Sequence, residues 1–326
     1  MCVQSSAIKS QERCIFFITN KGFMMPTLKS LSYLIDVAKM GSIRKAAEEL
    51  AITPSALNRR ILALEYELGA PIFERLPRGV RLNTAGELLI DHIRRQNSDI
   101  DRLRSQIADL SGIRRGHVSI ACSQALLPYF LPTQIEQYNS EHPSVSFGVY
   151  LRDRDAAEHS LMEYETDIAL VFEPIHFSHF QTIMTVRQPV CAVMNANHPL
   201  AKLDSVRLRE CLQYPLALPM APFGVRFLLD AGAARLGIDL EPLIQSDSFE
   251  FLTSFSATQD IITFQIPIGL PTANPLNNRR IVPLDPRDAM PGLLYLGQLR
   301  DRTLPVAAAR FADQIANSFA KNFDYN

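Results

Sequence analysis

The most restrictive feature of the sequence is a pair of helical patterns that only a few residues separate. Residues 43–50 carry apolar residues at helical spacing, and a second such pattern covers residues 55–68. Thr53 fits the N-cap of the second helix, and Pro54 fits its first turn, where no backbone N–H is needed. Because so short a connection makes two helices cross steeply, the pattern predicts a helix-turn-helix.

The first turn of the second helix would then project outward with side chains that suit DNA. A helical hairpin of this kind also occurs in ordinary protein cores, so the pattern alone leaves both interpretations open. If it binds DNA, short polar side chains reach base edges in the major groove and arginines reach bases or phosphates. The candidates for these contacts are Thr53, Pro54, Ser55, Asn58, Arg59 and Arg60.

The next stretch, "PIFERLPRGVRLN", favours the DNA-binding interpretation. It reads as two short extended segments, residues 72–75 and 80–82, with a turn at residues 77–79. A small hairpin that carries arginines suits contact with phosphates or with the minor groove. A helix-turn-helix followed by such a basic hairpin is a winged helix, and the added contact candidates are Arg75, Arg78 and Arg81.

Residues 31–86 resemble the DNA-binding region of LysR-type transcriptional regulators. The resemblance rests on "GSIRKAAEEL", "TPSALNRRILALEYELG", "IFERL" and "LNTAG", and it continues more loosely along the chain. Two positions depart from the family pattern: Asn58 stands where the family usually has serine, and Asn83 replaces threonine. The resemblance implies a regulator that binds double-stranded DNA and a small-molecule effector, forms a homodimer or homotetramer, and contacts RNA polymerase.

A long helical pattern follows, residues 84–111, which we expect to link and dimerise the chain. Its apolar residues recur at alternating spacings of four and three, with Gln96 at the one polar position of the series. Such a narrow stripe is typical of a two-helix coiled coil. The alternative is that the stripe packs on the chain's own C-terminal domain. The expected dimerisation residues are Leu89, Ile93, Ile100, Leu103 and Ile107, with Leu110 at the end of the series.

From residue 117 onward, apolar strands alternate with helical stretches, which predicts an α/β body with a parallel sheet. Its length favours two lobes. The LysR resemblance implies the architecture of type 2 periplasmic binding proteins, with two crossovers and a ligand cleft. We expect crossovers near residues 187–191 and 301–305. The predicted organisation is therefore multi-domain: an extension (1–24), an all-α winged helix-turn-helix head (25–83), a linker helix (84–111), lobe I (112–187 plus 303–326) and lobe II (188–302).

Effector contacts are expected beyond the carboxyl ends of the body's strands, where ligands of open α/β sheets bind. The candidates at these positions are Ser123, Gln124, Arg152, Phe172, Phe223 and Gln265. The family resemblance favours Ser123 in particular. Each candidate also has a plainer interpretation in capping or turn formation, for example Ser123 as an N-cap.

Composition and motifs argue against several other classes of protein. The chain has 326 residues, a formal net charge of −1 and five cysteines without a C-x-x-C pair, which favours a reducing, cytoplasmic location. No stretch is apolar for long enough to span a membrane. His176 and His179 lack a third metal ligand, and no catalytic, cofactor or phosphate-loop motif is present, so we expect neither an enzyme nor a metal site. A solute-binding protein would match the body but would not need residues 27–110.

Overall fold

The computed structural model describes residues 28–110, 115–172, 178–257, 260–271 and 278–323. The expected N-terminal extension, His176 and the boundary between linker and body lie outside these ranges. The chain divides into two compact units, residues 1–97 and 98–326, which are described separately below. Within the described residues, no helix is long and apolar enough to cross a bilayer.

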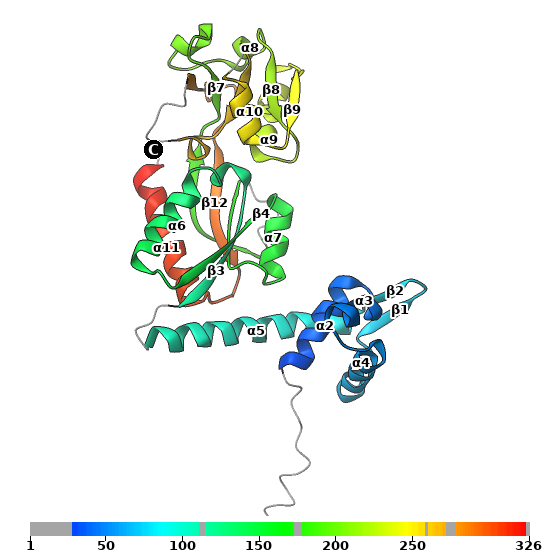
Figure 1. Ribbon diagram of the computed structural model, residues 1–326. Helices are drawn as coiled ribbons and strands as arrows, with labels where there is room; N and C mark the ends of the chain where they lie inside the picture. Colours follow the sequence, from blue (N-terminus) through cyan, green and yellow to red (C-terminus); the bar gives the residue numbers. More distant parts are fainter. Residues whose placement is uncertain (1–27, 111–114, 173–177, 258–259, 272–277, 324–326) are drawn as a thin grey trace, which may run out of the picture. The chain divides into compact units, whose positions relative to one another are not determined.

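The first unit has the predicted helix-turn-helix and wing. Helix α2 (Leu28–Met40) is followed by α3 (Ile43–Glu49) and α4 (Pro54–Leu68), then by strands β1 (Phe73–Leu76) and β2 (Gly79–Leu82) and the start of α5 (Thr84–Leu110). The two strands form an antiparallel hairpin, which Figure 1 shows beside α3. The prediction of a broken helix followed by a short hairpin is therefore confirmed.

Local hydrogen bonds explain where the helices of the head begin and end. Thr53 Oγ1 accepts a hydrogen bond from the Ala56 N–H at 3.3 Å, and α4 ends at Gly69, whose φ is +70°. Asn83 Oδ1 accepts from the Gly86 N–H at 2.9 Å and so caps α5. A capping side chain satisfies an N–H group that has no partner within the helix.

Apolar side chains from every element of the head meet in one core. Ala46 and Ala47 of α3 are fully buried, and these small residues let α3 pack closely against its neighbours. Helix α5 also contributes to this core. The buried members are Leu34, Val37, Ala46, Ala47, Leu57, Ile61, Ile72, Phe73, Ile90 and Ile93.

The predicted stripe of α5 is therefore divided between two environments, and of its first part Ile93 was wrongly assigned to a dimer seam. Ile93 is 0% exposed and Leu89 is partly buried, both against the head's own core. Further along, Leu103 is 54% exposed, Ile107 55% and Leu110 89%. Because a seam between subunits needs side chains that their own subunit leaves uncovered, Ile93 is not part of one. The exposed part of the stripe remains suited to dimerisation.

The first lobe of the second unit is built on a five-stranded sheet with the order β4-β3-β5-β12-β6. Strand β3 pairs in parallel with β4 and β5, whereas β12 runs antiparallel to β5 and β6. The strands are β3 (Gly116–Cys122), β4 (Val145–Leu151), β5 (Ile168–Phe172), β6 (Phe180–Gln188) and β12 (Gly292–Leu299).

Helices cover both faces of this sheet. Helix α7 (Arg154–Met162) packs over Ala121 of β3, whereas α6 (Phe130–Glu141) and α11 (Val306–Asn322) share a core with Ile120. Since successive residues of a strand point to opposite faces, α7 and α11 lie on opposite sides of the sheet, as Figure 1 shows.

The second lobe is built on another five-stranded sheet, with the order β11-β7-β10-β8-β9. Its strands are β7 (Cys191–Asn195), β8 (Leu216–Pro219), β9 (Ile244–Ser246), β10 (Ile262–Gln265) and β11 (Arg279–Pro283). Its helices are α8 (Leu208–Cys211), α9 (Gly224–Leu236) and α10 (Phe249–Phe255). Three short 3₁₀ helices complete the two lobes: η1 (Gln124–Leu126), η2 (Pro199–Lys202) and η3 (Pro267–Gly269).

The chain crosses between the two sheets twice, and one predicted crossover was placed too late. It leaves the first sheet after Gln188 and enters the second at Cys191, within the expected interval. It returns between Pro283 and Gly292, not near residues 301–305, because β12 lies between β5 and β6 of the first sheet. Residues 292–302 therefore belong to lobe I. The sequence marks β12 as a buried strand but does not reveal its neighbours.

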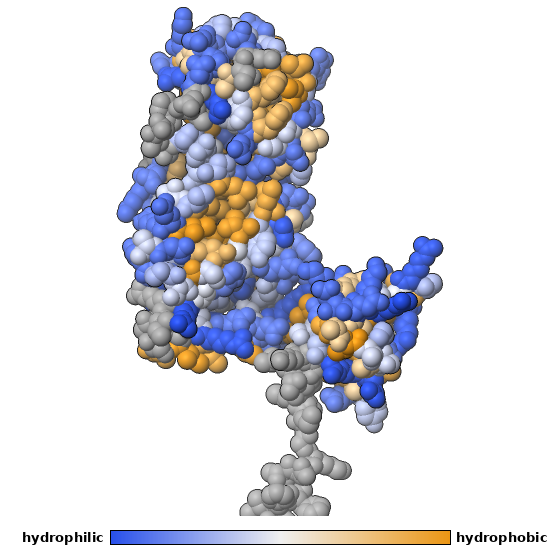
Figure 2. Space-filling model, in the orientation of Figure 1, coloured by the Kyte–Doolittle hydropathy of each residue, from blue (hydrophilic) through white to orange (hydrophobic). Residues whose placement is uncertain are grey.

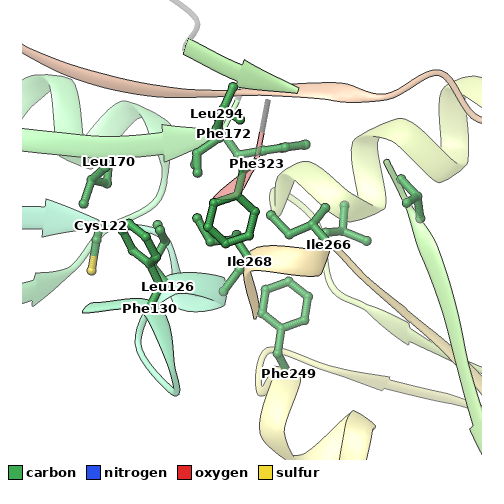
Figure 3. Close-up of a cluster of buried hydrophobic side chains, with 14 of the residues drawn as sticks. Cys122, Leu126, Phe130, Leu170, Phe172, Phe249, Ile266, Ile268, Leu294 and Phe323 are labelled. Carbon is green, nitrogen blue, oxygen red and sulfur yellow. The ribbon is translucent and has the colours of Figure 1, made fainter. Parts of the chain in front are cut away.

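The two lobes share a continuous apolar cluster. Figure 3 shows Phe172 and Leu126 of the first lobe close to Ile266, Ile268 and Phe249 of the second. A shared core of this kind holds the lobes against each other and supports a cleft between them.

Candidate functional site

The first turn of α4 presents its polar side chains to solvent. Thr53, Pro54, Ser55 and Arg59 are exposed, and Asn58 is half-buried. The Thr53 hydroxyl is engaged by its cap and lies 3.2 Å from the Ser55 hydroxyl. Sequence reasoning therefore identified an outward-facing turn correctly, although Thr53 also has a structural role.

The five arginines that sequence analysis nominated differ in their surroundings. Arg59 and Arg78 are exposed and have no ion-pair partner within the described part of the chain. The Arg60 guanidinium lies over the Tyr33 ring, 5.0 Å from its centroid, and so packs against the head. Arg81 donates to Glu74 at 2.7 Å, and this hydrogen bond raises the pKa of Arg81. Arg59 and Arg78 thus remain as exposed cations for phosphate or base contacts.

Arg75 has another kind of partner. Its Nη2 donates to Oδ1 of Asn58 at 3.2 Å and so joins the wing to α4. The wing is also fixed by its backbone, because Val80 N–H donates to Gly41 O at 2.9 Å. Figure 2 shows hydrophilic residues over the tip of this hairpin. Wing and helix therefore form one polar surface with a defined geometry.

A pocket of about 420 Å³, counting its solvent-open part, lies between the two lobes. Four of the six predicted effector residues line it: Ser123, Arg152, Phe172 and Phe223. Sequence reasoning missed the remaining lining residues, many of which are apolar side chains that only the approach of the lobes brings together. They are Ala125, Asp153, Arg154, Val171, Pro222, Gly224, Val225, Phe249 and Ile266.

The polar groups of the pocket all belong to the first lobe. Ser123 occupies the N-cap position of η1, but its side chain makes no capping hydrogen bond there. Asp153, in contrast, accepts from the Ala156 N–H at 2.8 Å and caps α7. Arg152 lies 5.5 Å from the centroid of the Tyr150 ring and donates to Leu151 O. The pocket therefore has a hydroxyl, a carboxylate and the guanidinium groups of Arg152 and Arg154 on one wall.

Phe172 and Phe223 form part of the apolar wall. The Phe172 ring is buried against two glycines: a Cβ at Gly224 would lie 2.2 Å from it, and one at Gly292 would lie 2.1 Å from it. Phe223 packs against Phe249, with 5.5 Å between the ring centroids. These contacts suit a ligand with an apolar body.

Gln124 and Gln265, the other two predicted effector residues, do not line the pocket. Gln124 Oε1 accepts from the Phe249 N–H at 2.8 Å and so links the first lobe to the start of α10 in the second. Gln265 is buried, and its Oε1 accepts from the Ile266 N–H at 2.9 Å. Both amides have a hydrogen bond inside the fold, which explains why they do not face a ligand.

The described cysteines do not provide a reactive thiol. Burial raises the pKa values of Cys122, Cys191 and Cys211 to about 12, so these thiols stay protonated at neutral pH. No group of three or more potential metal-ligating residues occurs within the ranges that the structure describes.

Family models match both parts of the chain. The model described as "Bacterial regulatory helix-turn-helix protein, lysR family" matches residues 28–87, and the model described as "LysR substrate binding domain" matches residues 111–320. The second match alone covers more than half of the chain.

Curated relatives and solved structures agree with these matches. The chain is 28% identical to the transcriptional dual regulator GltC of Bacillus subtilis (75% of this chain, 87% of the relative) and 25% identical to the HTH-type transcriptional activator CmpR of Synechocystis (68% and 73%). Its fold is similar to full-length OxyR from Pseudomonas aeruginosa (TM-score 0.66, 18% identity, 91% and 95% covered). It is also similar to full-length CbnR complexed with its target DNA (TM-score 0.58, 15% identity, 90% and 100% covered). The chain belongs to the LysR family of bacterial helix-turn-helix transcriptional regulators.

Proposed function

We propose that this regulator binds its operator through the first turn of α4 and the β1-β2 wing, and that a ligand in the cleft between the lobes modulates this binding. The observation that supports the DNA contact best is the pair of exposed arginines, Arg59 on α4 and Arg78 on the wing, which no acidic side chain of the described chain neutralises. Such cations release counterions from a duplex and reach bases or phosphates. The remaining contacts assigned to DNA are those of Thr53, Pro54, Ser55, Asn58 and Arg75.

Binding of the full-length chain to DNA from around its own gene tests this assignment. Fluorescence anisotropy at several salt concentrations should show a sequence-specific complex. Replacing a phosphate-contacting arginine, as in Arg78→Ala, should lower the slope of log K against log salt by about 1. Arg44→Ala is the matched control, because Arg44 is an exposed head arginine that is paired with Glu48 at 3.2 Å. Equal slopes for wild type and Arg78→Ala would remove Arg78 from the interface.

We infer that the effector combines one anionic group with a compact apolar body. The anionic group would meet Arg152 and the Ser123 hydroxyl, and the body would lie against Phe172, Phe223 and Phe249. A charge-assisted hydrogen bond from arginine is stronger than a neutral one and is often bidentate towards carboxylates. A purely cationic or strongly polar ligand would leave the apolar wall without a partner.

A thermal-shift screen of the full-length chain tests this ligand class. Small carboxylic acids with aromatic or branched bodies should stabilise the protein, whereas the corresponding amides should not. Arg152→Ala should abolish the stabilisation. Arg209→Ala, which replaces an exposed arginine that donates to Leu236 O elsewhere in the second lobe, should leave it unchanged. Stabilisation by the amides to the same extent would refute the anionic assignment.

We propose a homodimer as the DNA-binding form, with a homotetramer of two dimers as the larger assembly. The exposed residues Leu103, Ile107 and Leu110 of α5 support a contact between subunits. A second apolar area lies on the visible face of the first lobe in Figure 2, and the edge strand β4 exposes Val149 and Leu151. Light scattering should give the mass of a dimer or tetramer, and Ile107→Asp should reduce it. A monomeric wild-type protein would refute the proposal.

The same assignment places the chain in the bacterial cytoplasm, where its operator and RNA polymerase are found, and makes it a regulator without an enzymatic reaction of its own. Family membership supports both statements.

A further inference from the structure

The side chain of Arg302, just after β12, is buried where the first lobe meets helix α5. It is 7% exposed, and the ring centroid of Tyr164 lies 5.0 Å from its guanidinium carbon. The guanidinium group donates to Oδ1 of Asp167 at 2.7 Å, to the backbone oxygen of Thr166 at 2.8 Å and to Oγ of Ser98 at 3.1 Å. Because a guanidinium is planar and its donors form a fixed fork, these partners hold the group in one orientation.

Asp167 connects this arginine to the first sheet. It stands immediately before β5, and its backbone N–H donates to Ser119 O at 2.8 Å, while its Oδ2 accepts from the Ser119 N–H at 2.9 Å. Ser119 belongs to β3, which pairs in parallel with β5. Both carboxylate oxygens of Asp167 are thus engaged, one by Arg302 and one by β3. A buried ion pair needs further hydrogen bonds to its members, and this pair has them, so it fixes Arg302 to the sheet.

Strands β3 and β5 lead from this ion pair to the pocket between the lobes. Ser123 follows β3 and Phe172 ends β5, and both residues line the pocket. Asp167 and Phe172 are five positions apart, which is about 16 Å at the rise of an extended strand. Because hydrogen-bonded strands move together, a shift of their carboxyl ends displaces Asp167 as well.

The hydrogen bond to Ser98 connects the same arginine to the linker helix. Ser98 lies within α5, and the earlier residues Ile90 and Ile93 of this helix are buried in the head's core. The contact with the first lobe and the contact with the head's core therefore belong to one uninterrupted helix.

We infer that Arg302 is a positioning residue, which anchors α5 to the first sheet and passes a change at the cleft to the helix that enters the head. The inference rests on the proposed modulation of operator binding by a ligand in the cleft. The Asp167 pair fixes the guanidinium group to the sheet, whereas the Ser98 hydroxyl joins that group to α5. Loss of this hydroxyl should release the helix and leave the ion pair and the pocket intact.

Hydrogen exchange of the full-length protein tests the anchor, with Ser98→Ala as the main variant. Alanine favours a helix more than serine does, so helix propensity alone would slow exchange around residue 98 by roughly twofold. Loss of a hydrogen bond to a charged group should instead accelerate exchange there by about tenfold. Ser98→Thr keeps the hydroxyl and should restore the protection. Slower or unchanged exchange in Ser98→Ala would overturn the inference.

Two further variants separate anchoring from general destabilisation. Ser105→Ala makes the same substitution in the same helix, at a residue whose hydroxyl has no hydrogen bond within the described part of the chain, so it should follow helix propensity alone. Arg302→Lys keeps a charge beside Asp167 but loses the fork of donors, and it should accelerate exchange in α5 as Ser98→Ala does. Circular dichroism should show that Ser98→Ala folds as wild type does, because the buried ion pair is left in place.

Operator DNA tests whether the anchor transmits a change between the two ends of α5. Coupling is reciprocal, so operator binding to the wild type should change exchange at residues 166–170 by about fivefold. In Ser98→Ala this response should disappear although the operator still binds. A response that is absent from wild type, or equal in the two proteins, would overturn the transmission through Arg302. Failure of wild type to bind any DNA would refute the proposed function instead, and exchange in the DNA-free protein would still decide the anchor.

Discussion

Gly79, in the turn of the wing, provides a direct test of how the wing is held. Its φ is +127°, and a Cβ at this position would lie 2.2 Å from Gly41 O, a backbone atom that cannot rotate away. The substitution Gly79→Ala should therefore displace the wing and break the 2.9 Å hydrogen bond from Val80 N–H to Gly41 O. Gly41 lies between α2 and α3, so the disturbance affects the whole head.

The expected loss of stability follows from two contributions. A residue forced into this backbone region costs about 1–3 kcal/mol, and a lost internal hydrogen bond costs about 0.5–1.5 kcal/mol. Gly79→Ala should thus lower the free energy of unfolding of the head by about 2–4 kcal/mol. For a domain of this size, that corresponds to a decrease in Tm of roughly 10–25 °C.

Gly69→Ala is the matched control for this experiment. Gly69 has a φ of +70° at the end of α4, but a Cβ there would meet no atom within 4 Å. Its replacement should cost only the left-handed backbone term of about 1–2 kcal/mol. Circular dichroism should follow the thermal unfolding of both variants, and anisotropy should follow their DNA affinity. Equal destabilisation by the two substitutions would refute the argument that Gly41 pins the wing.

Three further predictions concern the surface of α4, the thiols and the cleft. Arg59→Ala should weaken operator binding by about 1–3 kcal/mol, measured by fluorescence anisotropy. Arg60→Ala should weaken binding less, because the Arg60 side chain packs on Tyr33. A larger loss for Arg60→Ala than for Arg59→Ala would contradict these different roles. Gln124→Ala should accelerate hydrogen exchange at the amide that it now binds in α10, and unchanged protection would show that this bond does not hold the lobes together. Peptide-resolved alkylation at pH 8 should leave the thiols of Cys122, Cys191 and Cys211 unmodified until the chain unfolds. Rapid labelling of the native protein would contradict their burial. Burial raises the pKa of each of these thiols from 9.0 to about 12, so on raising the pH the unfolded state ionises first. Their contribution to the stability of the fold is therefore complete below pH 9 and is lost as the pH rises towards 12.

Local features of the sequence were sufficient to predict the head and its candidate DNA contacts. A cap at Thr53, a proline after it and the glycines that follow α2 and α4 act within a few residues, so their effect does not depend on the rest of the fold. The alternation of strands and helices likewise predicted an α/β body, because it depends on side-chain periodicity. The same periodicity could not divide the stripe of α5, since an apolar residue at helical spacing packs equally well on its own domain or on a partner.

What the amino-acid sequence determined by itself was therefore the order and type of the elements, the break before α4 and the basic hairpin that follows it. Tertiary structure alone decided that β12 joins the first sheet, that Ile93 fills the head's core and that Gln124 reaches across to α10. It also decided that Arg75 meets Asn58. Capping and periodicity act over a few neighbouring residues, whereas each of these pairings joins segments that are distant in the chain and depends on which surfaces the whole fold brings into contact.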